Sequence, residues 1–283
     1  MMKRTITVLM MLLFVCISFQ SAPYTVMAQG DSEGKDGKDE KVAEAKKDFT
    51  IPSSVLPISK ENTYTNPTQD LPYLQPSTLA EELLGTTDVK IENPDLIRIF
   101  NESTINDSKL AIGFRASIYL GEWPLAYESN GTEVNWEYQK VNTNFIDNRG
   151  GQSPQKLAYT QEQQKRVNGG LTAKIPNSEA VKKMMMIKAA EHTNLPLAFD
   201  TVIGQGTKKN NSYHIAPKQV GYLHSYVPAA HEKGKVTYGE VYLTFKGGKR
   251  KLEVKNVTQQ GVGAWIPVQD HLSFAFIAAN QPK

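Results

Sequence analysis

The five histidines are the residues that could hold a metal ion or act as general bases. They are His192, His214, His224, His231 and His271. No two of them stand four residues apart, the spacing that places two imidazoles on one face of a helix. Glu232 follows His231, but the continuation Lys233-Gly234-Lys235 lacks the second His of a zinc-protease motif. We expect His214 and His224 to lie on adjacent strands, and the sequence predicts no metal and no cofactor.

Two segments contain the residue types of catalytic motifs without the required geometry. Asp270-His271-Leu272-Ser273 holds Asp, His and Ser, but neighbours on a strand point to opposite faces, so Asp270 is badly placed to orient His271. No G-x-S-x-G elbow occurs in the chain. The Gly-rich segment 204–209 lacks the spacing of a phosphate-binding loop, and we interpret it as a flexible turn. The sequence therefore predicts no catalytic residue.

Paired carboxylates could support glycoside hydrolysis, because their separation is set in space and not along the chain. The glutamates in or beside expected strands are Glu128, Glu133, Glu137, Glu240 and Glu253. None has a neighbourhood that singles it out. A carboxylate-dependent hydrolase of the cell wall stays an alternative, as does an accessory or structural module for another exported protein, which would expose an apolar patch.

The densest basic run is the strongest candidate for a binding surface. It consists of Lys246, Lys249, Arg250 and Lys251 around Gly247-Gly248, with Lys255 beyond. At the tip of a hairpin these charges would create a positive potential able to hold an anionic polymer or a phospholipid surface. The simpler interpretation is a loop tip that only aids solubility.

The elements that must position these residues are mostly strands. Turn signals occur at Asn130-Gly131, Gly150-Gly151, 168–170 and Gly247-Gly248, and a long alternating strand is expected over 110–120. We expect 133–146 to pair with 155–173 as a half-exposed hairpin, since the charges of 161–166 disfavour a lipid-facing row. An apolar, β-branched run covers 264–279.

Helical signals are fewer. Short helices are expected over 77–85 and from Asn93, and one principal helix near 177–193, capped at 176–178 and well buried through Met184, Met185 and Met186. The predicted fold class is therefore mainly β, a β-rich α+β fold. It comprises an antiparallel, sandwich-like single domain over 49–283, with an extended, Pro-rich lead-in over 49–80.

The amino terminus predicts export. Lys3 and Arg4 precede an apolar run that is too short to span a membrane, and small residues lead to a cleavage site after Ala28. Residues 1–28 are thus a predicted signal peptide, with an uncleaved anchor as the alternative. Val15 before Cys16 argues against a lipoprotein. Residues 29–48 are polar and charged and predict a disordered spacer.

Removal of the signal peptide changes what the composition implies. The single Cys is lost, which excludes thiol chemistry and disulfides from the mature chain. The net formal charge falls from +3 to +1 with the loss of Lys3 and Arg4, so a nucleic-acid partner is not expected.

Long stretches of the chain resemble a known family. They are residues 61–72 (ENTYTNPTQDLP), 135–140 (NWEYQK), 176–184 (PNSEAVKKM) and 264–271 (AWIPVQDH). These resemble the YfkD-like family of exported proteins from Bacillus and relatives, across nearly everything after residue 50. The resemblance implies a Gram-positive origin and a one-domain organisation, and it brings no catalytic or binding residues. We therefore expect a non-enzymatic binding protein, secreted or associated with the cell envelope.

Overall fold

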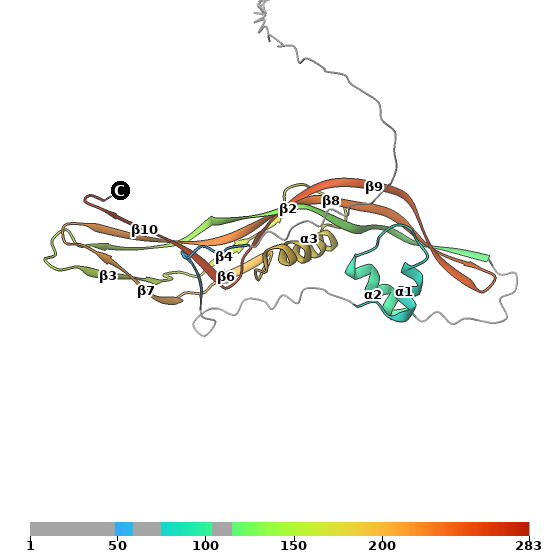
Figure 1. Ribbon diagram of the computed structural model, residues 1–283, viewed down its shortest axis with the longest axis horizontal. Helices are drawn as coiled ribbons and strands as arrows, with labels where there is room; N and C mark the ends of the chain where they lie inside the picture. Colours follow the sequence, from blue (N-terminus) through green and yellow to red (C-terminus); the bar gives the residue numbers. More distant parts are fainter. Residues whose placement is uncertain (1–48, 59–74, 104–114, 283) are drawn as a thin grey trace, which may run out of the picture. The chain divides into compact units, whose positions relative to one another are not determined.

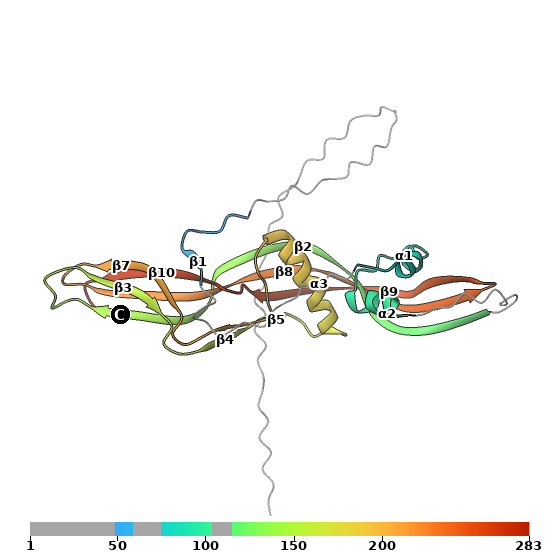
Figure 2. The same cartoon turned by 90° about the horizontal axis from the view of Figure 1, so that it is seen from below.

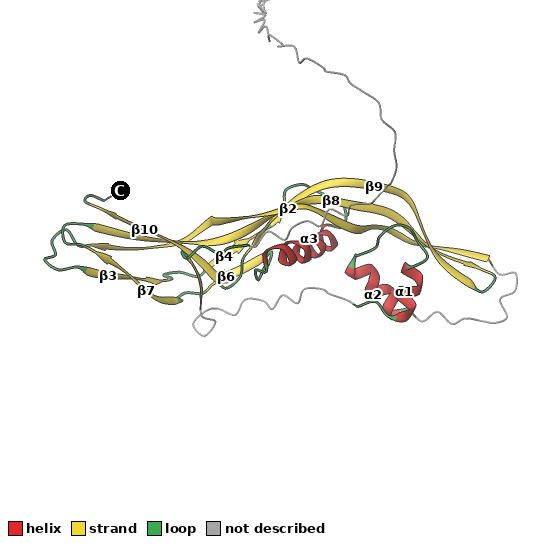
Figure 3. Cartoon of the chain, viewed as in Figure 1, coloured by secondary structure: helices red, strands yellow, loops and turns green. Residues whose placement is uncertain are grey.

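The computed structural model describes residues 49–58, 75–103 and 115–282, which belong to one compact unit that begins at Lys46. Every strand pair in these ranges is antiparallel (Figures 1 and 3). The helices are α1 (Thr78–Leu84), α2 (Pro94–Glu102) and α3 (Ser178–Thr193). The strands are β1 (Val55–Pro57), β2 (Arg115–Asp147), β3 (Gln155–Thr160), β4 (Lys165–Asn168), β5 (Gly170–Leu171), β6 (Asp200–Ile203), β7 (Lys208–Ile215), β8 (Val220–Lys246), β9 (Lys249–Pro267) and β10 (His271–Ala279). The predicted β-rich α+β class with one principal helix is confirmed.

The predictions for residues 1–48, including the signal peptide, Ala28 and the spacer, lie outside the described residues. Part of the Pro-rich lead-in is described. Its first segment forms β1, which pairs with β10 through Val55 and Ser273, and its end runs into α1. Residues 59–74 between them lie outside the described ranges.

Strand β8 is the centre of the main sheet and is paired on both sides along nearly its whole length (Figure 1). On one side β2 pairs from Arg115 opposite Lys246 to Asp147 opposite Val220. On the other side β9 pairs with the second part of β8, and β10 then pairs with the first part. Residues that are far apart in sequence therefore meet at each end of this three-stranded ribbon.

Strand β2 has 33 residues and β8 has 27, and β-bulges absorb the difference. Five register shifts interrupt their pairing. One lies between Ser129 and Gly131, where Gly131 has φ 153°. The predicted hairpin at Asn130-Gly131 is therefore wrong. Because β8 lies alongside β2, the Asn-Gly pair forms a bulge within a continuous strand instead of reversing the chain.

Pro228 divides the ribbon into two parts, because proline has no N–H to donate to a neighbouring strand. Opposite it, β2 bulges by three residues, 136–138. On the other side of β8, strand β9 ends at Pro267. The next residue, Val268, donates its backbone N–H to the carbonyl of Pro228 at 2.9 Å. The apolar run 264–279 is thus two strands with a turn at Asp270, which has φ 53°.

Three hydrophobic clusters follow the ribbon. Helix α3 lies across the strands (Figure 2) and packs Met184, Met185 and Met186 against β8 and β9, which confirms its burial. Around the first part of β8, Leu223 and Val227 pack with residues of β3, β4, β6, β7 and β10. At the other end α1 and α2 cover the β8–β9 hairpin through a cluster that includes Leu243 and Leu252.

Local signals predicted the short helices well and the pairing of distant strands poorly. Ser77 and Asn93 cap α1 and α2 with their side chains, as expected. Asn177, however, has a left-handed conformation and makes no side-chain cap on α3. The predicted hairpin of 133–146 with 155–173 is wrong, because β3 pairs with β7, and β4 pairs with β6.

The long strand expected over 110–120 is described only from Arg115 onwards, as the start of β2. The alternation of this strand places Ile118 on its apolar face, yet the residue is 47% exposed. Near the end of the ribbon no described helix covers this edge position.

The face of β8 that is buried changes along the strand. Its position at the end of the ribbon shows which side chains point away from the helices. Odd positions such as Leu223 and Val227 are buried first, then even positions from Ala230 to Tyr238, then Val241 and Leu243. Because successive strand residues point to opposite faces, Tyr242, Thr244 and Lys246 lie on the face away from α1 and α2.

Candidate functional site

The basic run occupies the end of the ribbon, at the predicted turn. Gly247 and Gly248 have φ 56° and 80° and join β8 to β9, the backbone that a two-residue hairpin loop requires. Lys246 and Lys249 lie directly opposite each other, and Arg115 lies opposite Lys246 on the other side. Cβ atoms of such directly opposed residues are about 4.5–5.5 Å apart. The fold thus places three cations side by side, an arrangement that costs stability through like-charge repulsion.

Lys251 extends this group on the same face, since it lies two residues beyond Lys249. We call Arg115, Lys246, Lys249 and Lys251 the tip cations, and all four are exposed. No acidic side chain within 49–58, 75–103 or 115–282 forms an ion pair with any of them. Their positive charge is therefore not neutralised by the described part of the chain.

The other two predicted residues have acidic partners. Arg250 points to the face of α1, where its guanidinium lies 3.3 Å from the Glu82 carboxylate. Lys255 lies 3.8 Å from the Glu253 carboxylate and 4.7 Å from the centre of the Tyr242 ring. Sequence reasoning missed Arg115, because only strand pairing brings it beside Lys246.

Grooves follow the outer edge of β9 beneath the tip. The largest, about 360 Å³, is lined by Lys246, Lys249, Arg250 and Lys251 together with Thr86, Thr244 and Glu253. A second, of about 330 Å³, lies towards Gly248 and Leu83, and a third, of about 260 Å³, continues to Asp88 and Lys255. Thr86 lines all three grooves. We call them together the β9 groove.

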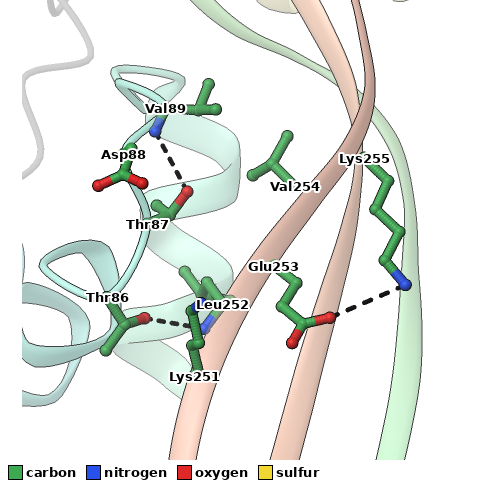
Figure 4. Close-up of a pocket in the computed structure, with 9 residues that line it drawn as sticks. All are labelled: Thr86, Thr87, Asp88, Val89, Lys251, Leu252, Glu253, Val254 and Lys255. Atoms are coloured by element: carbon green, nitrogen blue, oxygen red, sulfur yellow. Dashed lines mark hydrogen bonds and ion pairs between the residues drawn. The ribbon is translucent and has the colours of Figure 1, made fainter.

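The side chains around Thr86 fix the groove (Figure 4). The Leu252 N–H donates to Oγ1 of Thr86 at 2.8 Å, and the Thr86 hydroxyl donates to the carbonyl of Leu83 at 2.6 Å. The free edge of β9 is thereby tied to the end of α1. Figure 4 shows the Glu253 carboxylate directed toward Lys255 and not toward Asp88.

Behind the tip cations the same sheet face changes character. Tyr119 and Tyr242 lie opposite each other with ring centres 5.1 Å apart. Glu122 then lies opposite Glu240, whose carboxylate accepts a hydrogen bond from the Tyr242 hydroxyl at 2.9 Å. The positive potential is therefore confined to the end of the hairpin.

A second polar cluster lies in the middle of the ribbon, between β2, β8 and α3. Glu232 has no exposed surface and is the only buried acidic or basic residue in the described ranges. Tyr127 donates to Oε1 of Glu232 at 2.9 Å, and the Thr132 hydroxyl donates to Oε2. Oγ1 of Thr132 also lies 2.9 Å from Nδ1 of His192, which must then be the donor. Burial, followed by the charge of Glu232, raises the pKa of Tyr127 above its usual range.

Sequence reasoning missed Glu232 as a buried residue, although a signal exists. It stands in phase with Ala230, Val236 and Tyr238, which are all buried. A lone carboxyl on an otherwise apolar strand face predicts buried partners. Here the partners of Glu232 are Tyr127 and Thr132 of β2, which bind its carboxylate. Of the residues in this cluster, His192 is the one that is exposed to solvent.

The remaining histidines lie apart. His214 on β7 pairs with β3, whereas His224 on β8 contacts Thr143 of β2, so the expectation that they lie on adjacent strands is wrong. His231 stacks on Trp265 at 4.2 Å, and burial lowers the pKa of its imidazole. His271 Nδ1 lies 2.9 Å from the carbonyl of Gln269. Within the described ranges, no three His, Cys, Asp or Glu residues could hold a metal.

The candidate glutamates are spread along the ribbon. Glu128, Glu133 and Glu137 are exposed residues of β2, while Glu240 and Glu253 have the partners given above. The hydrolase alternative stays a prediction. Segment 204–209 is a turn at Gly206 leading into β7, with Thr207 donating to the Gly204 carbonyl at 2.7 Å.

The geometry defines a β-rich α+β protein built on a three-stranded ribbon with a cationic tip. A family model described as YfkD-like protein matches residues 52–283. An uncharacterized protein YfkD from Bacillus subtilis (strain 168) is 64% identical over 239 residues, which cover 84% of this chain and 90% of the relative. The chain therefore belongs to the YfkD-like family, as its sequence resemblance predicted.

An aerolysin-like protein from Bombina maxima aligns with 59% of this chain and 99% of its own, at 8% identity and a TM-score of 0.14. A TM-score this low does not indicate a shared fold. Among the helices of the described ranges, none has the length and apolarity needed to cross a membrane.

Proposed function

We propose that this chain is an exported, non-enzymatic protein that binds an anionic component of the cell envelope through the end of its β8–β9 hairpin. One observation carries the proposal. Strand pairing places Arg115 beside Lys246 and Lys249, with Lys251 next to them, on one exposed face. Four cations held this close repel one another, and a multivalent anion would relieve that repulsion.

The size of the effect is sufficient for reversible attachment. A Lys or Arg near an anionic surface contributes about 1 kcal/mol. Four tip cations would then contribute on the order of 4 kcal/mol, or about a thousandfold in affinity. Since the charges are exposed, salt should weaken the attachment, with a screening length of about 10 Å at 0.1 M.

Export is the second part of the proposal and rests on residues 1–28. The positive start, the short apolar run and the small residues before Ala28 have the order of a cleaved signal peptide. Export would bring the tip cations to the phosphate-rich envelope of a Gram-positive cell. The export part is tested by sequencing the amino terminus of the protein recovered from culture medium and envelope fractions; a start at Gln29 is expected, and an intact Met1 in the cytoplasm would contradict it.

Binding is tested by co-sedimentation with envelope fragments of Bacillus subtilis. The purified mature chain should sediment at low salt and be released at high salt. The variant Lys246→Gln/Lys249→Gln/Lys251→Gln should lose most of this binding, because it removes three of the four tip cations. The control Lys156→Gln/Lys165→Gln/Lys233→Gln removes the same charge from exposed positions elsewhere and should bind like the parent protein.

Equal retention of the two triple variants would overturn the binding proposal. Matching thermal unfolding curves for both variants would show that any loss reflects the surface and not the fold. Gln keeps the length of the Lys stem, so both variants should remain folded.

A further inference from the structure

The β9 groove bears on which anionic ligand binds the tip, a lipid bilayer or a linear polymer. A bilayer presents a flat array of phosphates, whereas a linear polymer presents phosphates in a row. The tip has both a flat face and a groove. The ligand that fits better is the one whose shape brings its phosphates to more of the cations. All five cations of the basic run line the groove, and Arg115 does not.

We propose that the ligand is a linear phosphodiester polymer that lies in the β9 groove, an inference that rests on the proposed function and names its partner. The groove follows β9 from Gly248 to Lys255. At about 3.3 Å per residue, this path is roughly 23 Å long. That length accommodates several repeats of a phosphodiester chain and exceeds the size of a single headgroup.

The groove is held in shape by contacts that also orient its cations. The Glu82 carboxylate holds Arg250 at 3.3 Å, and Glu253 holds Lys255 at 3.8 Å. Arg250 therefore faces the groove edge and not the flat face of the tip cations. Lys255 also lines the groove, but it lies opposite Glu240 and its ammonium is 4.7 Å from the centre of the Tyr242 ring, on the face of the tip cations. Lys249 and Lys251 lie at the rim, where they serve both surfaces.

The groove also supplies groups that suit a hydroxylated phosphate polymer. Hydroxyls of Thr86, Thr87 and Thr244 line it beside the lysines. A phosphodiester oxygen accepts charge-assisted hydrogen bonds from Lys and Arg. The Thr86 hydroxyl already donates to Leu83 and accepts from Leu252. The ligand hydroxyls would therefore accept from Thr87, whose hydroxyl accepts from Val89, or donate to Thr244, whose hydroxyl donates to Lys251. Three carboxylates, Glu82, Asp88 and Glu253, also line the groove, so its five cations leave a net charge of +2; Asp88 and Glu253 are shown in Figure 4.

A flat bilayer would use different residues. It would contact Arg115, Lys246, Lys249 and Tyr119, which share the outward face, and it would not reach into the groove. Glu122 and Glu240 on that same face would oppose a close approach over a larger area. The linear ligand is favoured because it can use Arg250, which lies on the α1 side of β9, together with the cations at the groove rim.

The test compares one chemistry in two shapes. Poly(glycerol phosphate) chains and vesicles of phosphatidylglycerol carry the same glycerol phosphodiester. Binding of the mature chain is measured at equal phosphate concentration, with polymer chains shorter and longer than the groove. We expect longer chains to bind at least tenfold more tightly per phosphate than vesicles, with affinity levelling off once the chain spans the groove.

Two double variants with equal charge change separate the surfaces. Arg250→Gln/Lys255→Gln should lower polymer affinity about tenfold or more and reduce the log–log salt slope by about 1 to 2, since each lost phosphate contact reduces counterion release. Arg115→Gln/Lys233→Gln should lower polymer affinity by less than the first double variant, about fivefold at most, because Arg115 is a tip cation that does not line the groove. Lys255→Gln alone keeps the Arg250–Glu82 pair and should reproduce part of the loss, which guards against a folding defect.

Two results would overturn the groove assignment. They are equal losses in the two double variants, or vesicles that bind as tightly as the longest polymer. If the lysine triple variant still lost envelope binding in either case, the proposed function would stand and only the choice of a linear ligand would fall.

Discussion

The hydroxyl of Tyr127 donates a hydrogen bond to Oε1 of Glu232 at 2.9 Å, deep between β2, β8 and α3. The contact joins two strands at residues that are not directly opposite, since Tyr127 lies opposite Val236. It is possible because Gly234, between Glu232 and Val236 on the same face, leaves room for the tyrosine ring. This buried pair is the polar anchor of the middle of the ribbon.

Tyr127→Phe should destabilise the protein by roughly 1–3 kcal/mol, because it leaves a buried carboxyl oxygen without its donor. Tyr242→Phe is the matched control: the Tyr242 hydroxyl donates to Glu240 at the same 2.9 Å, but neither residue is buried. The control should cost less than about 1 kcal/mol. Urea unfolding at unchanged m-value measures both, and equal losses would show that burial does not govern this contact.

Gly234→Ala should destabilise the protein by about 1–3 kcal/mol or more. A Cβ at this position would overlap the carbonyl oxygen of Glu128 and the hydroxyl of Tyr127. At Gly261 an added Cβ has nothing within 4 Å, so Gly261→Ala should be neutral or slightly stabilising. Thermal unfolding of the two variants checks the difference; a tolerated Gly234→Ala would mean that β2 can move away from β8 here.

Alkaline pH should unfold the protein as Tyr127 is forced to ionise. The folded pKa of this tyrosine is raised by burial and by Glu232, whereas an unfolded tyrosine titrates near 10. Its stabilising contribution is therefore complete below about pH 10 and falls as the pH rises further. Burial also raises the pKa of Tyr159, so tyrosinate absorbance should show more than one group that ionises only together with unfolding, and Tyr127→Phe should reduce their number by one.

Asp147 should titrate with a midpoint of about 2 in the folded protein. Hydrogen bonds from the Arg149 side chain, and then its backbone N–H, lower the pKa of this exposed carboxyl to about 2. Its stabilising contribution is present above about pH 4 and is lost as the pH falls towards 2. Arg149→Gln should raise the midpoint partway towards about 3.9, measured by NMR of the Asp147 carboxyl. High salt should raise it too, and a midpoint unaffected by either change would contradict the pairing seen here.

Local sequence signals succeeded where neighbouring residues decide the structure. The Gly247-Gly248 turn, the Ser77 and Asn93 caps and the burial of Met184, Met185 and Met186 all depend on residues within a few positions. The prediction of a hairpin turn at Asn130-Gly131 was wrong because a distant segment decides the structure there. The preference of this pair for a hairpin turn was outweighed by the pairing of β2 with β8, more than a hundred residues later.

The candidate site divides in the same way. A run of lysines and an arginine around two glycines predicts a cationic hairpin tip from the sequence alone. Because successive strand residues point to opposite faces, the sequence could also have predicted that Arg250 lies on the opposite face from Lys249 and Lys251. The presence of Arg115 and the neutralisation of Arg250 by Glu82 could not be predicted, because both depend on contacts between distant segments.

By itself the sequence determined the β-rich class, the family, the principal helix and the location of the basic hairpin, since composition, periodicity and turn chemistry act locally. Only the tertiary structure decided that β2 accompanies β8 along its whole length, that Glu232 is buried under Tyr127 and Thr132, and that a groove follows β9 beside Thr86. Those relationships arise from strand register and from the packing of helices on the ribbon. Register is fixed by the summed burial and hydrogen bonding of whole strands, which no short segment contains.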